Sequence, residues 1–467
     1  MTKDPGFDHG LLSPSSAGRP IEAVTDDEAV LQAMLDAEAA LVRAQAQLGV
    51  VPDEHATTIT AVAGAGRLDL DRIARRGVKA GNPVDALVAE LTAAVTAVDP
   101  AAAEYVHRGS TAQDILDTGL MLVADRALRL IDADLAATAD ALAALAARHR
   151  ATAMPGRALT QHGAPITFGL KAAGWLTGVL DARRRLRSVL DGGLPVQLGG
   201  EAGTLGGYLE YARLAGDSGE AYAARLIRAF AEEVTLAEPA LAWHTVRTPL
   251  HEIATAASLT TGVLGALAAD VQVMTRTEIG ELAEPAPPGG GLSCALPHRR
   301  QPVLATRIRT AATQVPLLAA SVAHCLVAED ERPGGAWHAE WQPLREALRL
   351  AGGAADAAAE LTEGLTVFPA RMRANLDVFG QLAAAGRLAV WLGPPFGPAV
   401  AEEIVVDLAL RAHQRGKSLR DVATADPRVA DVMDAGRVAA TLDPAGYVGA
   451  AGELVDRVLH RYHEGID

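Results

Sequence analysis

The sequence predicts an all-α protein built around a bundle of long helices, and three observations lead to this class. Alanine and leucine dominate the composition, whereas aromatic residues make up only 4% of it, a balance that favours closely packed helices over a sheet sandwich. Long stretches lack proline and repeat apolar residues three or four positions apart, which is the period of a helix with one buried face. At 467 residues the chain exceeds the usual size of one compact core, so we expect two or three packed units.

The first predicted helix covers residues 25–48. It opens with Thr25 and Glu28, which have the spacing of a capping box, a pair of side chains that bond the free N–H groups at a helix start. Apolar residues then recur at helical spacing as far as Leu48. We therefore expect a helix of about six turns.

The bundle itself is predicted from four longer segments. The segment from Pro249 to Leu282 has proline only at its first position, where proline suits a helix start, and at 1.5 Å per residue it would extend for ~50 Å. Its apolar stripe runs from Ile253 to Met274 and needs partners of similar length to cover it. The matching segments are residues 114–149, 166–190 and 303–328.

We expect three helical domains, an N-terminal domain of residues 1–108, a central bundle of residues 109–345 and a C-terminal domain of residues 346–467. Two glycine-rich breaks interrupt the bundle, at residues 192–208 and 285–302. Loops of this size inside a helical protein commonly carry function. The first break lacks the Gly-Lys-Ser/Thr ending of a phosphate-binding loop and does not follow a predicted strand, so we do not expect it to bind a nucleotide.

Charge and cysteine content narrow the classes of function. The formal net charge is −15 and no run of Lys and Arg is long enough to follow a phosphate backbone, so nucleic acid is not an expected partner. Residues 1–10 lack the order of a secretory signal, and no stretch reaches the ~18 apolar residues of a membrane span, so we expect a cytoplasmic protein. The two cysteines, Cys294 and Cys325, have no companions at metal-ligand spacing. We expect no disulfide, no metal and no cofactor, with Cys325 in the core.

Five separated segments carry a resemblance to one family. The segments are GNPVDALV (81–88), VHRGSTAQDILDT (106–118), GRALTQHGAPITFGLKAAGW (156–175), GGGLSCALPHRRQPV (289–303) and GGAWHAEWQPLREALRLA (334–351). In this order they resemble segments of the fumarase/aspartase superfamily, and the fifth is most similar to its bacterial 3-carboxy-cis,cis-muconate cycloisomerases. The resemblance implies a homotetramer whose long helices join in one shared bundle and whose active sites each draw on three subunits.

The resemblance also implies the chemistry. Members of the superfamily take a proton from the carbon next to a carboxylate, or return it there, through a carbanion that the carboxylate stabilises. Ser293 lies where the family has its proton-transfer serine, and His162 is expected to act as an acid or base or to hold a substrate carboxylate. A serine hydroxyl is a poor base unless it is desolvated and surrounded by donors. The expected substrate is therefore a small dicarboxylate or tricarboxylate enclosed by the loop around Ser293.

Other residues in the same segments are expected to bind that substrate. Hydroxyl groups and a histidine at the start of a helix suit a carboxylate ligand. Asp114 and Asp117, in contrast, are expected to cap the helix that begins there. The expected substrate-binding residues are His107, Ser110, Thr111, Gln113, Gln161, Thr204, Arg299, Gln301 and His338.

Two departures from the family pattern bear on the substrate. Lyases that expel an amine or a hydroxyl usually carry a Thr-His pair where this chain has Ala158 and Leu159, so the acid that protonates such a leaving group is missing. This absence favours a leaving group that needs no proton, such as a carboxylate. In the loop around Ser293, the usual Ser, Met, Lys and Asn are replaced by Cys294, Leu296, Arg299 and Gln301, and the Arg for Lys exchange changes both reach and hydrogen-bond geometry.

Three functions follow from these observations. The first is an intramolecular lyase that interconverts 3-carboxy-cis,cis-muconate and 4-carboxymuconolactone in the breakdown of aromatic acids. The second is a lyase that releases fumarate from an N-substituted succinate, either adenylosuccinate or nitrosuccinate, since nitrite is a weak base and leaves without an acid. The third, a catalytically inactive relative kept for interactions, is disfavoured because Ser293, His107, Thr111 and His162 are all present.

Overall fold

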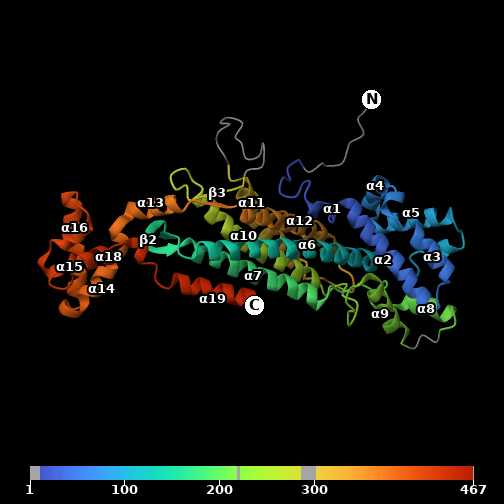
Figure 1. Ribbon diagram of the computed structural model, residues 1–467. Helices are drawn as coiled ribbons and strands as arrows, with labels where there is room; N and C mark the ends of the chain where they lie inside the picture. The colour runs from blue at the N-terminus through green and yellow to red at the C-terminus, as the bar shows by residue number, and fades with distance from the viewer. Residues whose placement is uncertain (1–10, 218–220, 286–300, 466–467) are drawn as a thin grey trace, which may run out of the picture. The chain divides into compact units, whose positions relative to one another are not determined.

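The computed structural model describes residues 11–217, 221–285 and 301–465. Helices dominate this part of the chain (Figure 1), which confirms the predicted all-α class. The helices of the first half are α1 (Pro20–Ala23), α2 (Asp27–Gln47), α3 (Asp53–Val62), α4 (Leu70–Ala80), α5 (Val84–Thr96), α6 (Ala112–Arg148), α7 (Phe168–Gly192), α8 (Gly206–Leu214) and α9 (Tyr222–Val234). Those of the second half are α10 (Thr248–Met274), α11 (Val303–His324), α12 (Ala336–Glu363), α13 (Pro369–Phe379), α14 (Ala385–Phe396), α15 (Pro398–Arg415), α16 (Leu419–Thr424), α17 (Pro427–Ala430), α18 (Ala435–Thr441) and α19 (Ala451–Glu464).

Tertiary contacts divide the chain into two compact units, each assembled from three stretches. Unit 1 comprises Met1–Ala136, Ala182–Gly265 and Arg307–Ala358, and unit 2 comprises Ala137–Asp181, Ala266–Thr306 and Ala359–Asp467. The long helices α6, α7, α10, α11 and α12 each begin in one unit and continue into the other. Both predicted boundaries, at 108 and 345, fall inside unit 1, and the division into three domains stays a prediction.

In unit 1, the long helices approach one another closely because small residues lie where they meet. A Cβ atom placed on Gly265 of α10 would lie 2.5 Å from the Cβ of Ala312 on α11, far inside van der Waals contact. Likewise, Gly119 of α6 lies against Met34 of α2. Helices α2 to α5 and α9 share one apolar core, in which Leu87 and Phe230 are fully buried. This core fixes the start of α6, where the predicted binding segment lies.

Unit 2 contains a β-hairpin that the sequence reading did not predict. Strands β1 (Ala153–Ala158) and β2 (Gln161–Thr167) pair antiparallel. The connecting residues Leu159 and Thr160 both have positive φ, at 49° and 69°, as the central residues of a tight hairpin turn do. Residues 153–167 contain proline and glycine, which disfavour a helix. This composition was the sequence signal for a non-helical segment here.

The C-terminal part of unit 2 forms a separate small core. Helices α14 to α18 surround apolar side chains that include Leu392, Leu408 and Val429, all 0% exposed. A further helix, α19, is held to the chain just after α6 by a two-point ion pair. Arg150, two residues beyond the end of α6, donates to Asp456 at 2.7 and 2.6 Å.

Three predicted helix boundaries were wrong, and one of them is the end of α11, which lies at His324 rather than at residue 328. Helix α10 ends at Met274, eight residues before Leu282, because the chain turns at residues 275–280 and Leu282 enters the short strand β3 (Leu282–Ala283), paired with β4 (Thr366–Val367). At the start of α2 the cap is Asp26, whose carboxylate accepts from the Ala29 N–H at 2.7 Å. The Thr25 hydroxyl instead donates to the Ile21 carbonyl at 2.7 Å.

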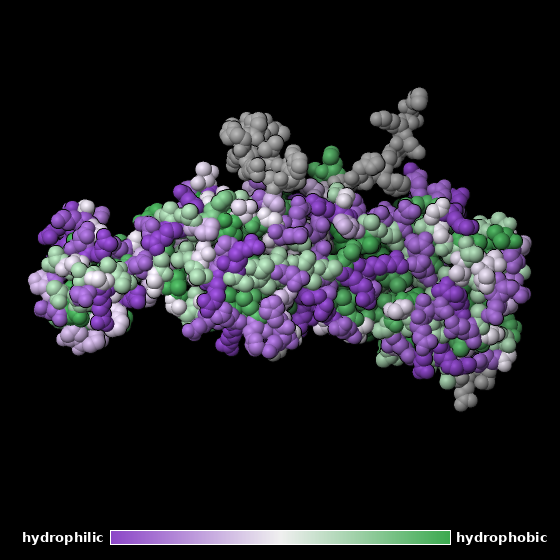
Figure 2. All heavy atoms as spheres, viewed as in Figure 1, coloured by the Kyte–Doolittle hydropathy of each residue, from purple (hydrophilic) through white to green (hydrophobic). Residues whose placement is uncertain are grey.

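Apolar side chains remain on the surface of the long helices. Leu259 of α10 is 40% exposed and Leu317 of α11 is 72% exposed, and Figure 2 shows hydrophobic residues interspersed with hydrophilic ones on the face in view. Of the described helices, α10 alone is long and apolar enough to cross a membrane, yet half of its most apolar window is buried inside the protein. Buried core helices of soluble proteins have the same composition.

The cap of α2 provides a test of the corrected boundary. We expect Asp26→Ala to reduce the free energy of unfolding by about 1 kcal/mol, because the Ala29 N–H loses its acceptor. Glu28→Ala, the other half of the predicted capping box, should change it by less than ~0.5 kcal/mol. Thermal and urea unfolding of the two variants would measure this difference. Equal losses in the free energy of unfolding would instead support the predicted capping box.

Candidate active site

The start of α6 is fixed by one buried carboxylate, that of Asp114. Its oxygens accept from the backbone N–H groups of Gly199 and Gly200 at 2.8 and 3.0 Å. They also accept from the Tyr208 hydroxyl at 2.9 Å and lie 3.3 Å from Nε2 of His244. Asp114 therefore ties the first glycine-rich break and the segment before α10 to the binding segment, rather than serving only as the predicted helix cap.

Gly199 has a packing reason to be glycine. A Cβ at this position would lie 2.7 Å from the Cβ of Ala242 and 2.8 Å from Cε1 of His244. Any side chain would push the break away from Asp114. The first glycine-rich break can therefore approach Asp114 closely because Gly199 has no side chain, and the two backbone hydrogen bonds then hold it there.

Asp117, one turn further along α6, is also more than a cap. Its carboxylate accepts two hydrogen bonds from the guanidinium of Arg247, at 2.7 and 3.0 Å. It also accepts from the indole N–H of Trp337 at 2.9 Å and from Nε2 of Gln197 at 3.1 Å. Arg247 in turn donates to Glu340 of α12. All three charged side chains are at most 1% exposed.

Arg332 reaches the binding segment from the loop between α11 and α12. Its Nη1 donates to the Thr111 hydroxyl at 2.8 Å and its Nε to Oε1 of Gln113 at 3.3 Å. Gln113 is 0% exposed and uses its amide N–H on the His244 carbonyl at 3.0 Å. Gln113 therefore orients Arg332, whereas the sequence reading had it bind substrate itself.

The half-buried guanidinium of Arg332 uses its Nε and Nη1 groups on Gln113 and Thr111, and its Nη2 group remains. Within residues 11–217, 221–285 and 301–465 its Nη2 has no hydrogen-bond partner. A planar guanidinium with two adjacent N–H groups suits a carboxylate or another planar anion. Arg332, which the sequence analysis did not include among the substrate-binding residues, is therefore a candidate anion-binding group.

His107 adds a second basic side chain to the same segment. Its Nδ1 donates to the buried carboxylate of Glu38 at 2.6 Å. Burial alone would lower the pKa of His107, but the charge of Glu38 and this hydrogen bond outweigh it, so that the pKa is raised above its ordinary value. Its backbone has a φ of 57°, a left-handed conformation that a non-glycine residue adopts at a cost and that clusters at functional sites.

The other predicted residues of unit 1 differ in their exposure to solvent. Ser110 and Thr111 are half-buried, and Thr204 is exposed in the glycine-rich break. His338 is exposed at the start of α12, and a Cβ on Gly81 would lie 3.9 Å from its Nε2. Segment 81–88 and the start of α12 are thereby neighbours.

The remaining predicted residues belong to unit 2. Gln161 is exposed at the first position of β2, His162 follows it half-buried, and Gln301 is exposed just before α11. Ser293 and Arg299 lie outside the described residues. Lys171 of α7, in the same family-like segment as His162, pairs with Asp270 at 3.0 Å.

Buried polar groups fix the chain where it enters and leaves residues 286–300. Glu281 is 0% exposed and accepts two hydrogen bonds from Arg157, at 2.9 and 2.7 Å, and one from Asn375 at 2.8 Å. Glu284 accepts from the Leu304 and Ala305 N–H groups at 3.0 and 2.8 Å. Glu284, which precedes residues 286–300 in the chain, thus caps the start of α11, which follows them.

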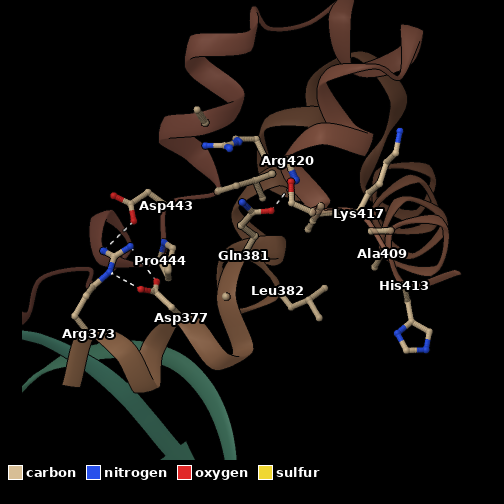
Figure 3. A pocket seen from close by; sticks show the side chains of 16 residues that line it. Arg373, Asp377, Gln381, Leu382, Ala409, His413, Lys417, Arg420, Asp443 and Pro444 are labelled. Carbon is tan, nitrogen blue, oxygen red and sulfur yellow. Dashed lines mark hydrogen bonds and ion pairs between the residues drawn. The ribbon is translucent and has the colours of Figure 1, made fainter. Parts of the chain in front are cut away.

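A hollow of about 730 Å³ lies elsewhere in unit 2, among α13, α15 and α16 (Figure 3). Arg373 on its wall is paired with Asp377 at 3.0 Å and with Asp443 at 3.3 Å. Figure 3 shows Lys417 and His413 extending in different directions rather than converging with Arg373. No sequence-predicted site residue lines this hollow, so it is not the site of the predicted chemistry.

Comparison with known proteins decides the family. A lyase family model matches residues 18–317, and a model of the adenylosuccinate lyase C-terminus matches residues 382–458. The chain belongs to the fumarase/aspartase superfamily. Ser293 and the binding segments at residues 81–88 and 106–118 all fall within the longer match, and the chain is thus an enzyme of the lyase superfamily by descent.

Several relatives match over nearly the whole chain. A nitrosuccinate lyase of Streptomyces davaonensis is 54% identical over 97% of this chain and 94% of its own. A 3-carboxy-cis,cis-muconate cycloisomerase of Bradyrhizobium diazoefficiens is 39% identical over 96% and 97%. Among solved structures, the 3-carboxy-cis,cis-muconate lactonizing enzyme of Pseudomonas putida has a TM-score of 0.88 at 36% identity, with 96% and 97% of the two chains covered.

The sequence reading missed three charged residues of the site, Arg332, Arg247 and Glu38. Arg332 lies only two residues before the family-like segment 334–351, so its nearness to that segment was a usable signal. No sequence signal pointed to Arg247 or Glu38, because each forms its ion pair with a residue more than 60 positions away in the chain.

The His107 pair gives a prediction with a definite sign. A raised pKa means that charged His107 stabilises the fold fully below its ordinary pKa of 6.5 and that this stability is lost as pH rises through the folded value. Glu38→Gln should therefore lower the pKa of His107, as followed by NMR titration of the histidine ring protons. Glu90→Gln, which removes a buried carboxylate from the Arg72 and Arg76 pair instead, should leave it unchanged.

Arg332 provides a test of anion binding. Replacing it with Lys keeps the charge but loses the fork of N–H groups, and we expect a loss of roughly tenfold to a hundredfold in kcat/KM. Gln113→Leu should reproduce part of that loss, because Arg332 would keep its charge but lose its orientation. Steady-state kinetics would measure both, and an unchanged kcat/KM in Arg332→Lys would contradict the assignment.

Proposed function

We propose that this protein is a fumarate-releasing lyase that eliminates nitrite from nitrosuccinate. The observation that carries the proposal is the 54% identity to a nitrosuccinate lyase, against 39% to the cycloisomerases, over matches of equal extent. The sequence reading put the cycloisomerase first and this lyase second, and the comparisons favour the reverse order. The absent Thr-His pair, replaced by Ala158 and Leu159, agrees with a leaving group that needs no acid.

The elimination moves one proton and two electron pairs. A base takes a proton from the CH₂ carbon of nitrosuccinate, and the adjacent carboxylate stabilises the resulting carbanion. The electron pair then forms the C=C bond of fumarate, and the C–N bonding pair departs with nitrite. The proton stays on the base until it passes to water. Ser293 is the proposed base, and His162 is the next candidate.

The described site supplies the charges that this reaction needs. Substrate and carbanion carry two carboxylates, and two basic groups lie at one segment of unit 1. They are the guanidinium of Arg332 and the imidazole of His107, whose pKa is raised by Glu38. Preorganised donors of this kind stabilise developing charge by several kcal/mol because they need no rearrangement during the reaction. Thr111, held by Arg332, adds a hydroxyl beside them.

The second candidate function is the cycloisomerase. It is supported by the cycloisomerase relatives at 37–39% identity and by the structural match to the Pseudomonas putida enzyme. The two reactions share the carbanion next to a carboxylate, so the same cations serve both. They differ in the bond that is made or broken, which is C–N in one and lactone C–O in the other.

We further propose that the active protein is a cytoplasmic homotetramer whose sites each combine segments of three subunits. The exposed Leu259 and Leu317 on the long helices support burial against other copies. A small dicarboxylate or tricarboxylate is the proposed partner, with neither nucleic acid nor membrane involved.

The function is tested by product analysis. Incubation with nitrosuccinate should release nitrite and fumarate in equal amounts, whereas 3-carboxy-cis,cis-muconate should keep its diene absorbance and adenylosuccinate should remain intact. Ser293→Ala should lower turnover at least ~100-fold while binding is retained, in keeping with the size of general acid–base effects. Loss of diene absorbance without nitrite release would make the protein a cycloisomerase, and no reaction in any tube would favour an inactive relative.

A further inference from the structure

A buried cluster of three charges in unit 1 has no part in the chemistry described above. It consists of Arg247, Asp117 and Glu340, whose side chains are 1%, 0% and 0% exposed. Arg247 lies between the two carboxylates and donates to both, with Nε also 3.3 Å from Oε2 of Glu340. Its guanidinium lies over the ring of Trp243, 4.7 Å from the centroid.

The two carboxylates have unequal surroundings. Asp117 accepts from the indole of Trp337 and the amide of Gln197 as well as from Arg247. Glu340 has Arg247 as its one donor among the described residues. Hydrogen bonds to a carboxylate favour its charged form, so Asp117 is the better stabilised anion of the two.

One cation cannot neutralise two anions. With both carboxylates ionised, the cluster would hold a net negative charge away from water, which is costly. The ionisable groups that face Glu340 are Arg247 and Asp117, with the Cys325 thiol near enough to feel its charge. Burial raises the pKa of Glu340 to about 7, since the pull of Arg247 does not fully offset burial and the charge of Asp117.

The cluster joins the three segments that carry the anion-binding groups. Asp117 is one turn and a half after Thr111 on α6, and Arg247 follows His244, whose carbonyl holds Gln113. Glu340 stands two residues after His338 on α12 and eight after Arg332. A change of charge in the cluster therefore acts on every segment to which Arg332 is attached.

We propose that Glu340 is a positioning residue that holds one proton, and that loss of this proton loosens the three helix starts and sets the upper pH limit of the enzyme. Protonated Glu340 leaves Arg247 and Asp117 as a balanced pair. Deprotonation adds a second buried anion, and the helix starts separate to admit water to it. The folded protein thus loses stability as pH rises from the ordinary carboxyl range to about 7, where the unfolded chain has already given up its proton.

The proton itself can be observed without any substrate. Infrared spectroscopy of the wild-type protein should show the C=O stretch of a protonated carboxylic acid at pH 5.5–6 that disappears with a midpoint near pH 7. Tryptophan fluorescence should change with the same midpoint, because Trp337 and Trp243 both contact the cluster. The infrared and fluorescence changes with a midpoint near pH 7 should be absent in Glu340→Gln, which keeps the shape of the side chain but has no proton to lose.

Activity and stability are then compared across pH. Above pH 7, wild-type kcat/KM for nitrosuccinate should fall by roughly fivefold or more relative to Glu340→Gln, a typical size for coupling between a switch and a site. The melting temperature of Glu340→Gln should rise relative to that of wild type between pH 5 and pH 8. Glu90→Gln, which lacks a buried carboxylate elsewhere in unit 1, should follow the wild-type profile in both measurements.

This inference rests on the proposed function only for the kinetic readout. If nitrosuccinate is not turned over but the infrared and melting profiles differ as expected, the proposed function fails and the proton on Glu340 stands. If Glu340→Gln shows the same infrared signal and the same pH profiles as wild type, the inference is overturned whatever the substrate. Should Glu340→Gln fold poorly, Asp117→Asn provides the second variant, and it should eliminate the midpoint near pH 7 by leaving Glu340 as the sole partner of Arg247.

Discussion

The structure of unit 1 depends on how buried carboxylates at the start of α6 are satisfied. Asp114 and Asp117 are both fully buried, and an ionised carboxylate away from water must be surrounded by donors. Those donors come from the first glycine-rich break, from the residues just before α10 and from α12. Because each of these segments must approach α6 to supply its N–H group, the carboxylates determine where the site residues stand.

The anion-binding groups follow from this arrangement. His244 lies beside Asp114, its carbonyl holds Gln113, and Gln113 holds Arg332. Each member of this series is oriented by a buried partner, so Arg332 does not have to lose side-chain freedom when an anion arrives. His107 is fixed separately by Glu38. Two cations held in this way suit a substrate with two carboxylates, whichever bond of that substrate is broken.

Substrate preference in such a site depends on the leaving group, because the basic side chains do not distinguish the two reactions. They stabilise a carbanion next to a carboxylate equally well in a lyase and in a cycloisomerase, which agrees with the presence of relatives of both kinds. The choice of leaving group depends instead on whether an acid is in reach. Ala158 and Leu159 at the turn between β1 and β2 offer no proton, which agrees with the weakly basic leaving group of the proposed reaction.

The sequence by itself determined the helical class and the family, because helical periodicity and local motifs depend on near neighbours in the chain. It also placed Cys325 in the core, where it is 4% exposed. It did not determine the roles of Gln113, Asp114 and Asp117, which looked like binding and capping residues beside their own helix. Only the tertiary structure showed that their partners are Arg332, Gly199 and Arg247, since a side chain's hydrogen bonds depend on which distant segments pack against it and a one-dimensional pattern does not contain that information.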